Sequence, residues 1–355
     1  MMKRQLTILD REIPSIDLFR LIAAFLVVTV HVKPRPFDEL IPGVSYLTTS
    51  VFARAALMFF FVVSGFFLAK RVMEKGPASV WRFVGRLWGS YTIWFVIYFW
   101  FNYKETIQAG INWADFLPQV ALDYFLWGGD LQLWFLPALC ICCILFWAFS
   151  LIRCQWIYFI LSVPLAAIGL LANPYRAIGR MTFLEPFFNS SLYSPLRRIF
   201  FMGMPVFLIG GILYATLDRW MRMRKETTDA LMLVSLSLFM AEPALLNRFS
   251  VNNGLMITLF LYPLEFFLLL WCIRNPMPKL EPYAAAMRYD AAGIYYSHYL
   301  FIFAVGTLSE FGGSYVDIFF DSAPTLQYAL VMLFTLCFVG IVRRSRFRAV
   351  RRLLH

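Results

Sequence analysis

Ionisable side chains are scarce in this chain. Only 15% of its 355 residues are Asp, Glu, Lys or Arg, three are histidine, and 61% are hydrophobic. A soluble globular domain carries about 25% charged residues, so this composition excludes one. Three histidines also provide few donors for a metal centre, and we predict no metal site.

The six cysteines follow neither the spacing of a zinc site nor that of a redox motif. Most of them fall within long apolar segments, where cysteine packs as a small hydrophobic residue. We therefore interpret as packing residues Cys140, Cys142, Cys143, Cys154, Cys272 and Cys337.

Apolar runs of about twenty residues, the length that a helix needs to cross a bilayer, recur along the whole chain. They predict an all-α, polytopic transmembrane helical bundle. The spans near 84–101, 156–172 and 289–308 are the weakest, because they are short or interrupted by polar residues. The ten predicted spans lie near 15–33, 51–69, 84–101, 133–152, 156–172, 199–217, 229–247, 254–273, 289–308 and 325–343.

The chain shows no internal repeat and no second folded domain. We therefore expect residues 1–355 to form a single integral membrane domain that ends in a basic tail at 344–355. The two longest outer loops, about 103–132 and 173–198, are long enough for a lid or a re-entrant segment.

Basic residues are distributed unevenly between the predicted loops. Of the 32 lysines and arginines, 22 fall on the side of the termini and eight on the other side, with Arg20 and Arg54 inside spans. The positive-inside rule then places both termini in the cytoplasm. Basic loops facing an anionic leaflet account for the net charge of +11 without nucleic acid. We expect a multi-pass protein of the cytoplasmic membrane.

The first span carries three ionisable residues, Asp17, Arg20 and His31. Such residues are costly in hydrocarbon and are seldom kept there without a function. Arg20 and His31 are eleven residues apart, about three helical turns, so they share a face and lie roughly 16 Å apart along the axis. Asp17 is close enough to pair with Arg20. The alternative is an interfacial ion pair that anchors the helix, with a hydrogen-bonded histidine at the opposite end.

Two further segments carry polar residues at predicted span ends. Ser64 and Gly65 allow another helix to approach the second span closely. Arg82 and Arg86 share a helix face where the third span enters from the cytoplasm. Because a planar guanidinium pairs with phosphate oxygens, they suit a phosphorylated ligand; the alternative is simple positive-inside anchoring.

Five motifs follow one another along residues 13–345. The first is Ile16-Asp17 followed by Arg20, ten residues, and His31. The others are Phe60–Phe66 with its Ser-Gly-Phe end, Leu133–Leu139 with Trp-Phe-Leu, Pro205–Gly210, and Gly293–His298 with Gly-Ile-Tyr-x-x-His. In this order they resemble the motifs of the acyltransferase-3 family, bacterial integral membrane enzymes that O-acylate cell-surface sugars.

The sequence departs from the family at two positions. The family often has Arg-x-x-Arg before the third span, whereas Phe83 occupies the position three before Arg86. Either Arg82 takes that role from the same helix face or phosphate binding is altered. Gln132 stands where the family often has His.

The resemblance implies a mechanism that agrees with the residue chemistry. An acyl-CoA, with acetyl-CoA the expected donor, would bind through Arg82, Arg86 and Ser64. His31, whose unperturbed pKa is about 6.5, would be the general base. Arg20 would bind the donor or stabilise developing negative charge, and Asp17 would hold Arg20. Pocket residues would be Trp134, Tyr295 and His298, for which aromatic packing or a structural histidine is the alternative.

The resemblance also bears on partners. The acceptor would be a cell-envelope polysaccharide or its lipid-linked precursor, a glycolipid or peptidoglycan. The chain would act alone or hand the acyl group to a separate extracytoplasmic transferase, with no permanently bound cofactor. A second hypothesis is a transporter of a small amino acid, as in racemase-linked family members, and a third is a non-catalytic scaffold.

Overall fold

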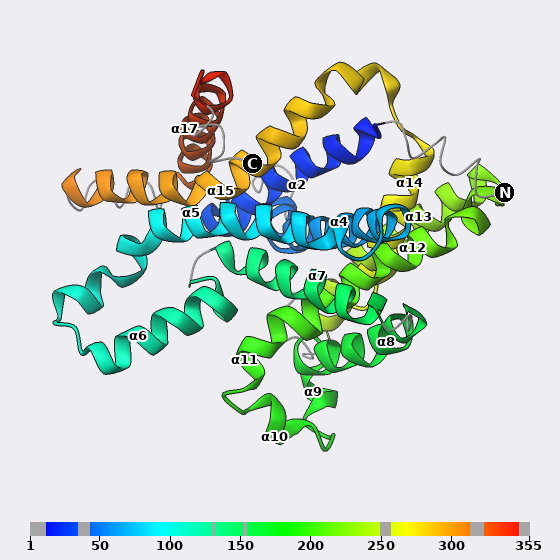
Figure 1. Ribbon diagram of the computed structural model, residues 1–355, viewed down its shortest axis with the longest axis horizontal. Helices are drawn as coiled ribbons and strands as arrows, with labels where there is room; N and C mark the ends of the chain where they lie inside the picture. The colour runs from blue at the N-terminus through cyan, green and yellow to red at the C-terminus, as the bar shows by residue number, and fades with distance from the viewer. Residues whose placement is uncertain are drawn as a thin grey trace.

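The computed structural model describes residues 12–34, 43–129, 132–151, 155–248, 257–312 and 323–347. These ranges are helical and contain no strands, so the predicted all-α class is confirmed for them (Figure 1). The longer α-helices are α2 (Pro14–Val32), α4 (Ala53–Lys75), α5 (Ser79–Gln108), α7 (Phe135–Leu151), α8 (Gln155–Ala172), α12 (Met204–Arg222), α13 (Lys225–Arg248), α14 (Leu261–Arg274), α15 (Glu281–Gly312) and α17 (Pro324–Arg344).

Each of the ten predicted spans overlaps one of these helices. Six segments of the described chain are long and apolar enough to cross a membrane, namely Pro14–Val32, Val44–Lys75, Gln132–Leu151, Arg197–Arg222, Lys225–Leu246 and Pro324–Arg344. The helices that fall short are α5, α8, α14 and α15, and these include the three spans predicted to be weakest. The chain is thus a multi-pass membrane protein, and the count of ten spans stays a prediction.

Short elements form the longer connections. Between α5 and α7 lie α6 (Trp113–Leu122), a π-helical turn at Asp123–Trp127 and a 3-10 turn at Gln132–Trp134; between α8 and α12 lie α9 (Arg176–Gly179), α10 (Glu185–Phe188), α11 (Tyr193–Leu196) and a π-helical turn at Arg197–Gly203. The remaining short elements are α3 (Val44–Tyr46), the π-helical turn Leu47–Phe52 and the 3-10 turn Pro278–Leu280. Figure 1 shows α6 and the α9–α11 segment projecting from the bundle. Residues 254–256 of the eighth predicted span, Cys154 and the tail beyond residue 347 lie outside the described residues.

Helices α4 and α12 pack with their backbones in close contact. A Cβ atom on Gly65 would lie 1.9 Å from the carbonyl oxygen of Phe207, and one on Gly210 would lie 1.9 Å from that of Val62. Only glycine fits at such distances. The close approach that the Ser64-Gly65 pair predicts is therefore confirmed, and it fixes Ser64 beside this contact.

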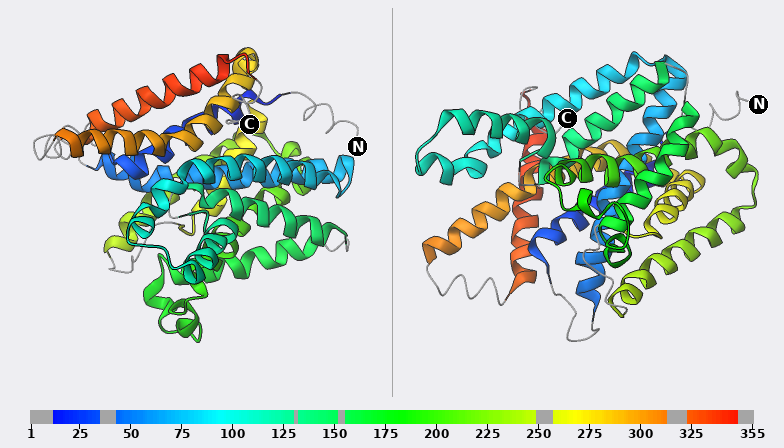
Figure 2. Two further views of the ribbon diagram at one scale, coloured as in Figure 1. Left: turned by 60° about the vertical axis from the view of Figure 1, so that its left-hand side comes forward. Right: turned by 90° about the horizontal axis from the view of Figure 1, so that it is seen from below.

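Helix α2 lies beside α15 (Figures 1 and 2). Ala24 and Val28 of α2 belong to one buried cluster with Ala291 and Ile294 of α15. The start of α2 has Pro14 in its first turn, where the missing N–H costs nothing. Ser15 Oγ donates a hydrogen bond to the Cys272 carbonyl oxygen at 2.7 Å, which ties this end of α2 to α14.

Candidate active site

Asp17 is shared by two arginines. Its carboxylate accepts a hydrogen bond from Arg20 Nη1 at 2.9 Å, and from Arg288 Nη2 at 2.8 Å and Nε at 3.1 Å. Only 4% of the Asp17 side chain is exposed. Its position in the first turn of α2 also places it at the positive end of the helix dipole. Asp17 therefore fixes two guanidinium groups, one on its own helix and one on α15.

Helical spacing in the sequence predicts only one of these two ion pairs. The pairing of Asp17 with Arg20 is present as expected, whereas Arg288, which directly precedes the predicted span at 289–308, is not among the predicted site residues. In the structure Arg288 lies on α15, well inside the helix. One signal in the sequence points to it, because Arg288 precedes His298 by ten residues and so resembles the order of Arg20 and His31 in α2.

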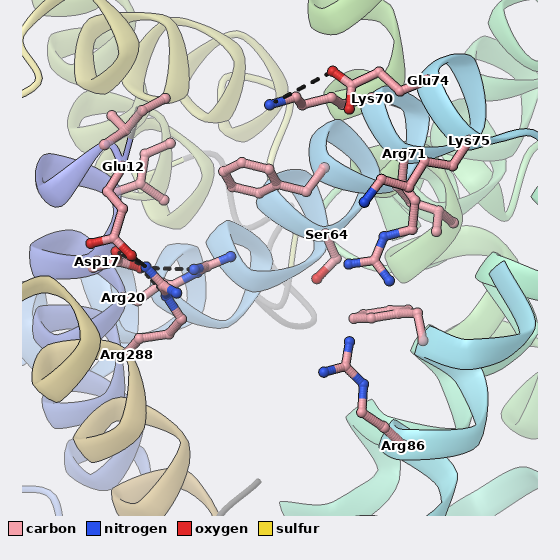
Figure 3. Close-up of a pocket in the computed structure, with 15 residues that line it drawn as sticks. Glu12, Asp17, Arg20, Ser64, Lys70, Arg71, Glu74, Lys75, Arg86 and Arg288 are labelled. Carbon is pink, nitrogen blue, oxygen red and sulfur yellow. Dashed lines mark hydrogen bonds and ion pairs between the residues drawn. The ribbon is translucent and has the colours of Figure 1, made fainter. Parts of the chain in front are cut away.

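A cavity of about 570 Å³ opens beside this network (Figure 3). Arg20 and Arg288 face it from one wall and Arg71 and Arg86 from the other, with Ser64 between them. Six basic and three acidic residues line it, namely Arg20, Lys70, Arg71, Lys75, Arg86 and Arg288 against Glu12, Asp17 and Glu74. This first cavity therefore suits an anion that carries more than one charge.

A second cavity of about 430 Å³ continues from the first. Five residues line both cavities: Arg20, Ser64, Phe83, Arg86 and Arg288. The rest of its wall is almost wholly apolar or aromatic and includes Tyr295. The two cavities together offer a charged mouth and an apolar interior, which matches an elongated ligand with a polyanionic head and a less polar arm.

The structure separates the predicted donor residues. Arg86 and Ser64 line both cavities, whereas Arg82 is exposed and lines neither. Trp134 also lies outside both cavities, where the Arg198 guanidinium stacks over its ring at 5.5 Å from the centroid. Arg71 lines the first cavity, although the sequence pattern did not single it out.

His31 and His298 lie together, His31 in the last turn of α2 and His298 in the middle of α15. Their ring centroids are 5.5 Å apart, and the Tyr299 ring is 5.0 Å from that of His31. His31 is exposed, whereas His298 is fully buried. His298 Nδ1 donates to the Ile294 carbonyl oxygen at 2.9 Å, which leaves Nε2 as an acceptor without a partner among the described residues.

Tyr295 connects this histidine pair with the second cavity. It lines that cavity, and its ring centroid lies 6.4 Å from that of His298. Its hydroxyl donates a hydrogen bond to the carbonyl oxygen of Gln132, which fixes the ring. Neither histidine lines either cavity itself, so Tyr295 separates them from the cavity interior.

The long apolar helices define an integral membrane protein, and its two linked cavities are basic at one end and apolar at the other. The acyltransferase domain of the acyltransferase-3 family matches residues 13–344, so the chain belongs to this family. The resemblance drawn from the five motifs is thereby confirmed.

Two curated relatives show weaker similarity. An amino-acid racemase of Enterococcus faecalis is 28% identical over 211 residues, which are 58% of this chain and 29% of that protein. A serine/alanine racemase of Enterococcus gallinarum is 27% identical over 262 residues, which are 72% of this chain and 36% of that protein. The chain thus matches a little over a third of these relatives' length at most. No solved structure matches it.

Proposed function

We propose that the protein is a membrane-bound O-acyltransferase, in particular an O-acetyltransferase, of the bacterial cytoplasmic membrane. It moves an acyl group from cytoplasmic acyl-CoA to a hydroxyl of a cell-envelope sugar or glycolipid. The observation that carries this proposal is the pair of linked cavities, charged at one end and apolar at the other. Coenzyme A has the same polarity, with a polyanionic nucleotide head and an uncharged arm that bears the thioester.

The donor binds with its phosphates in the first cavity and its arm in the second. Arg86 faces the phosphates and Ser64 lies where the two cavities meet, whereas Arg82 lines neither cavity and is left out of the donor site. Arg20 belongs to donor binding rather than to the acyl-transfer step. It lies roughly 16 Å from His31 along the helix axis, too far for both residues to contact one reacting carbonyl.

His31 acts as the general base in the transfer step. It takes the proton of the acceptor hydroxyl while the hydroxyl oxygen attacks the thioester carbonyl carbon. The carbon–sulfur bond then breaks, an oxygen ester forms, and the sulfur leaves as the thiol of CoA after taking up a proton. His298 lies beside His31 and donates its Nδ1 proton to the Ile294 carbonyl oxygen, and Tyr295 lines the second cavity next to this pair.

The test is acyl transfer by His31→Ala. We expect the rate to fall by about 10²–10⁴, the usual contribution of a general base, while the protein inserts and accumulates normally. The measurement is transfer of radiolabelled acetyl from acetyl-CoA to envelope material, normalised to protein level. Normal transfer by a well-expressed variant would place the base elsewhere, with His298 the next residue to test.

A second candidate is a transporter of a small amino acid, and the names of the two racemase relatives favour it. The same cavities would then bind an amino acid without acyl chemistry. Saturable uptake of labelled serine or alanine into proteoliposomes, together with no acyl transfer, would replace the first proposal. If acyl transfer needs a separate extracytoplasmic transferase, adding the extracytoplasmic protein fraction to the purified protein should restore it.

A further inference from the structure

The wall of the first cavity opposite Asp17 presents two guanidinium groups that lack an acidic partner. Arg71 on α4 and Arg86 on α5 both face the cavity (Figure 3). Neither makes an ion pair or a side-chain hydrogen bond with any described residue, whereas Arg20 and Arg288 share Asp17.

These two groups are held close despite their like charge. Arg82 and Arg86 lie near enough to Arg71 for their positive charges to repel its own. Arg71 is only partly exposed, so solvent screens this repulsion incompletely. A multiply charged anion between Arg71 and Arg86 would remove the repulsion, and each planar fork could take two of its oxygens.

Phe83 keeps Arg71 at this position. The Arg71 guanidinium lies over the Phe83 ring, 5.7 Å from its centroid, in a cation–π contact. Phe83 precedes Arg86 by three residues on α5, so both face the same side of that helix. Phe83 also lines both cavities. The ring thus positions a charge from α4 next to a charge from α5.

We propose that Arg71 and Arg86 form a two-helix clamp for the phosphate groups of the donor nucleotide, with Phe83 as the positioning residue for Arg71. This inference rests on the proposed function and makes it more specific. The exposed Arg82 is then a peripheral charge, and the guanidinium that completes the clamp comes from α4.

Binding of CoA to the purified protein in nanodiscs of uncharged lipid tests the clamp. We expect Arg71→Ala and Arg86→Ala to weaken CoA binding by at least about tenfold each, since each loses charge-assisted hydrogen bonds. The CoA affinity of the matched control Arg82→Ala should stay within about twofold of that of the unchanged protein. The CoA affinity of Arg71→Lys should lie between those of the unchanged protein and Arg71→Ala, because lysine keeps the positive charge but lacks the planar guanidinium. Pantetheine, which lacks the phosphates, should bind Arg71→Ala and the unchanged protein equally.

The role of Phe83 is tested by a double-mutant cycle. Phe83→Leu should weaken CoA binding by about threefold to fivefold through the lost cation–π contact. In the Arg71→Ala background the same change should have no further effect, because the residue it positions is gone. An equal loss in both backgrounds would mean that Phe83 only packs, and would overturn its positioning role.

Other outcomes separate the clamp from the acyltransferase proposal. Equal CoA affinity of Arg71→Ala and Arg82→Ala would overturn the clamp and leave the proposed function standing. Binding of inorganic pyrophosphate that depends on Arg71, with no binding of CoA, would keep the clamp and overturn the acyl-CoA donor. Arg71-dependent binding of phosphatidylglycerol incorporated into the nanodiscs, with no binding of CoA or of pyrophosphate, would identify a lipid headgroup and overturn the donor assignment.

Discussion

At the scale of single residues, the buried carboxylate of Asp17 holds one wall of the first cavity together, since its partners Arg20 and Arg288 come from α2 and α15. Asp17→Asn keeps the shape and removes the charge, so Arg20 loses its ion-pair partner and Arg288 keeps only the exposed Glu12. Breaking a fully buried ion pair costs about 3–5 kcal/mol. The partners of Asp17 are 21% and 47% exposed, so we expect a smaller loss that still gives a clear fall in the thermal unfolding midpoint. The matched control is Asp290→Asn, whose side chain is 24% exposed and pairs with Arg343; it should cost about 1 kcal/mol or less. Equal shifts for both variants would contradict this account.

The same residues show what the sequence reveals about the site. The Asp17–Arg20 pair is local, three residues apart on one helix, and helical periodicity is enough to predict it. The contact between Asp17 and Arg288 joins residues 271 positions apart, and no periodicity encodes which helices become neighbours. Arg71 was missed for a similar reason, since its role depends on Phe83 of the next helix.

At the scale of helices, the contact between α4 and α12 determines where Ser64 lies. Gly65→Ala would place a methyl group against the Phe207 carbonyl oxygen, which is backbone and cannot rotate away. We expect a loss of about 1–3 kcal/mol from overpacking and reduced transfer, because the neighbouring Ser64 lines both cavities. Gly340→Ala in α17 is the control, since nothing lies within 4 Å of its added methyl group. Thermal unfolding and acyl transfer of both variants measure the difference, and a stable, active Gly65→Ala variant would contradict the packing argument.

Helix boundaries were predictable only where apolar residues define them. The predicted third span, 84–101, is the middle of α5, which runs from Ser79 to Gln108. Similarly, α15 begins at Glu281, before the predicted span at 289–308, so Arg288 is helical and faces the site. Hydropathy detects the apolar part of a helix, which lies in hydrocarbon. It does not detect the polar turns by which the helix continues beyond that part. In this protein, residues of those polar turns line the charged cavity.

At the scale of the whole molecule, the directions of neighbouring helices agree with alternating membrane crossings. Residue numbers rise together along α2 and α15, as the Asp17–Arg288 and His31–His298 contacts show. They run oppositely along α15 and α17, where Asp290 contacts Arg343 and Phe301 stacks on Phe334. The predicted order makes α2 and α15 the first and ninth spans and α17 the tenth, so the observed directions support it.

This order predicts on which side the charged cavity opens. Ala78, exposed in the turn between α4 and α5, should face the cytoplasm, and Met181, 87% exposed between α9 and α10, should face outward. In a cysteine-free background, Met181→Cys should react with a membrane-impermeant maleimide in intact cells, and Ala78→Cys only after permeabilisation. The turn at Ala78 follows Lys75, which lines the first cavity, so labelling reports the side on which that cavity opens. Labelling of Ala78→Cys in intact cells would mean that the first cavity opens on the outer side of the membrane. A donor made there could then not reach Arg71 and Arg86, and a ligand from outside the cell would have to take its place.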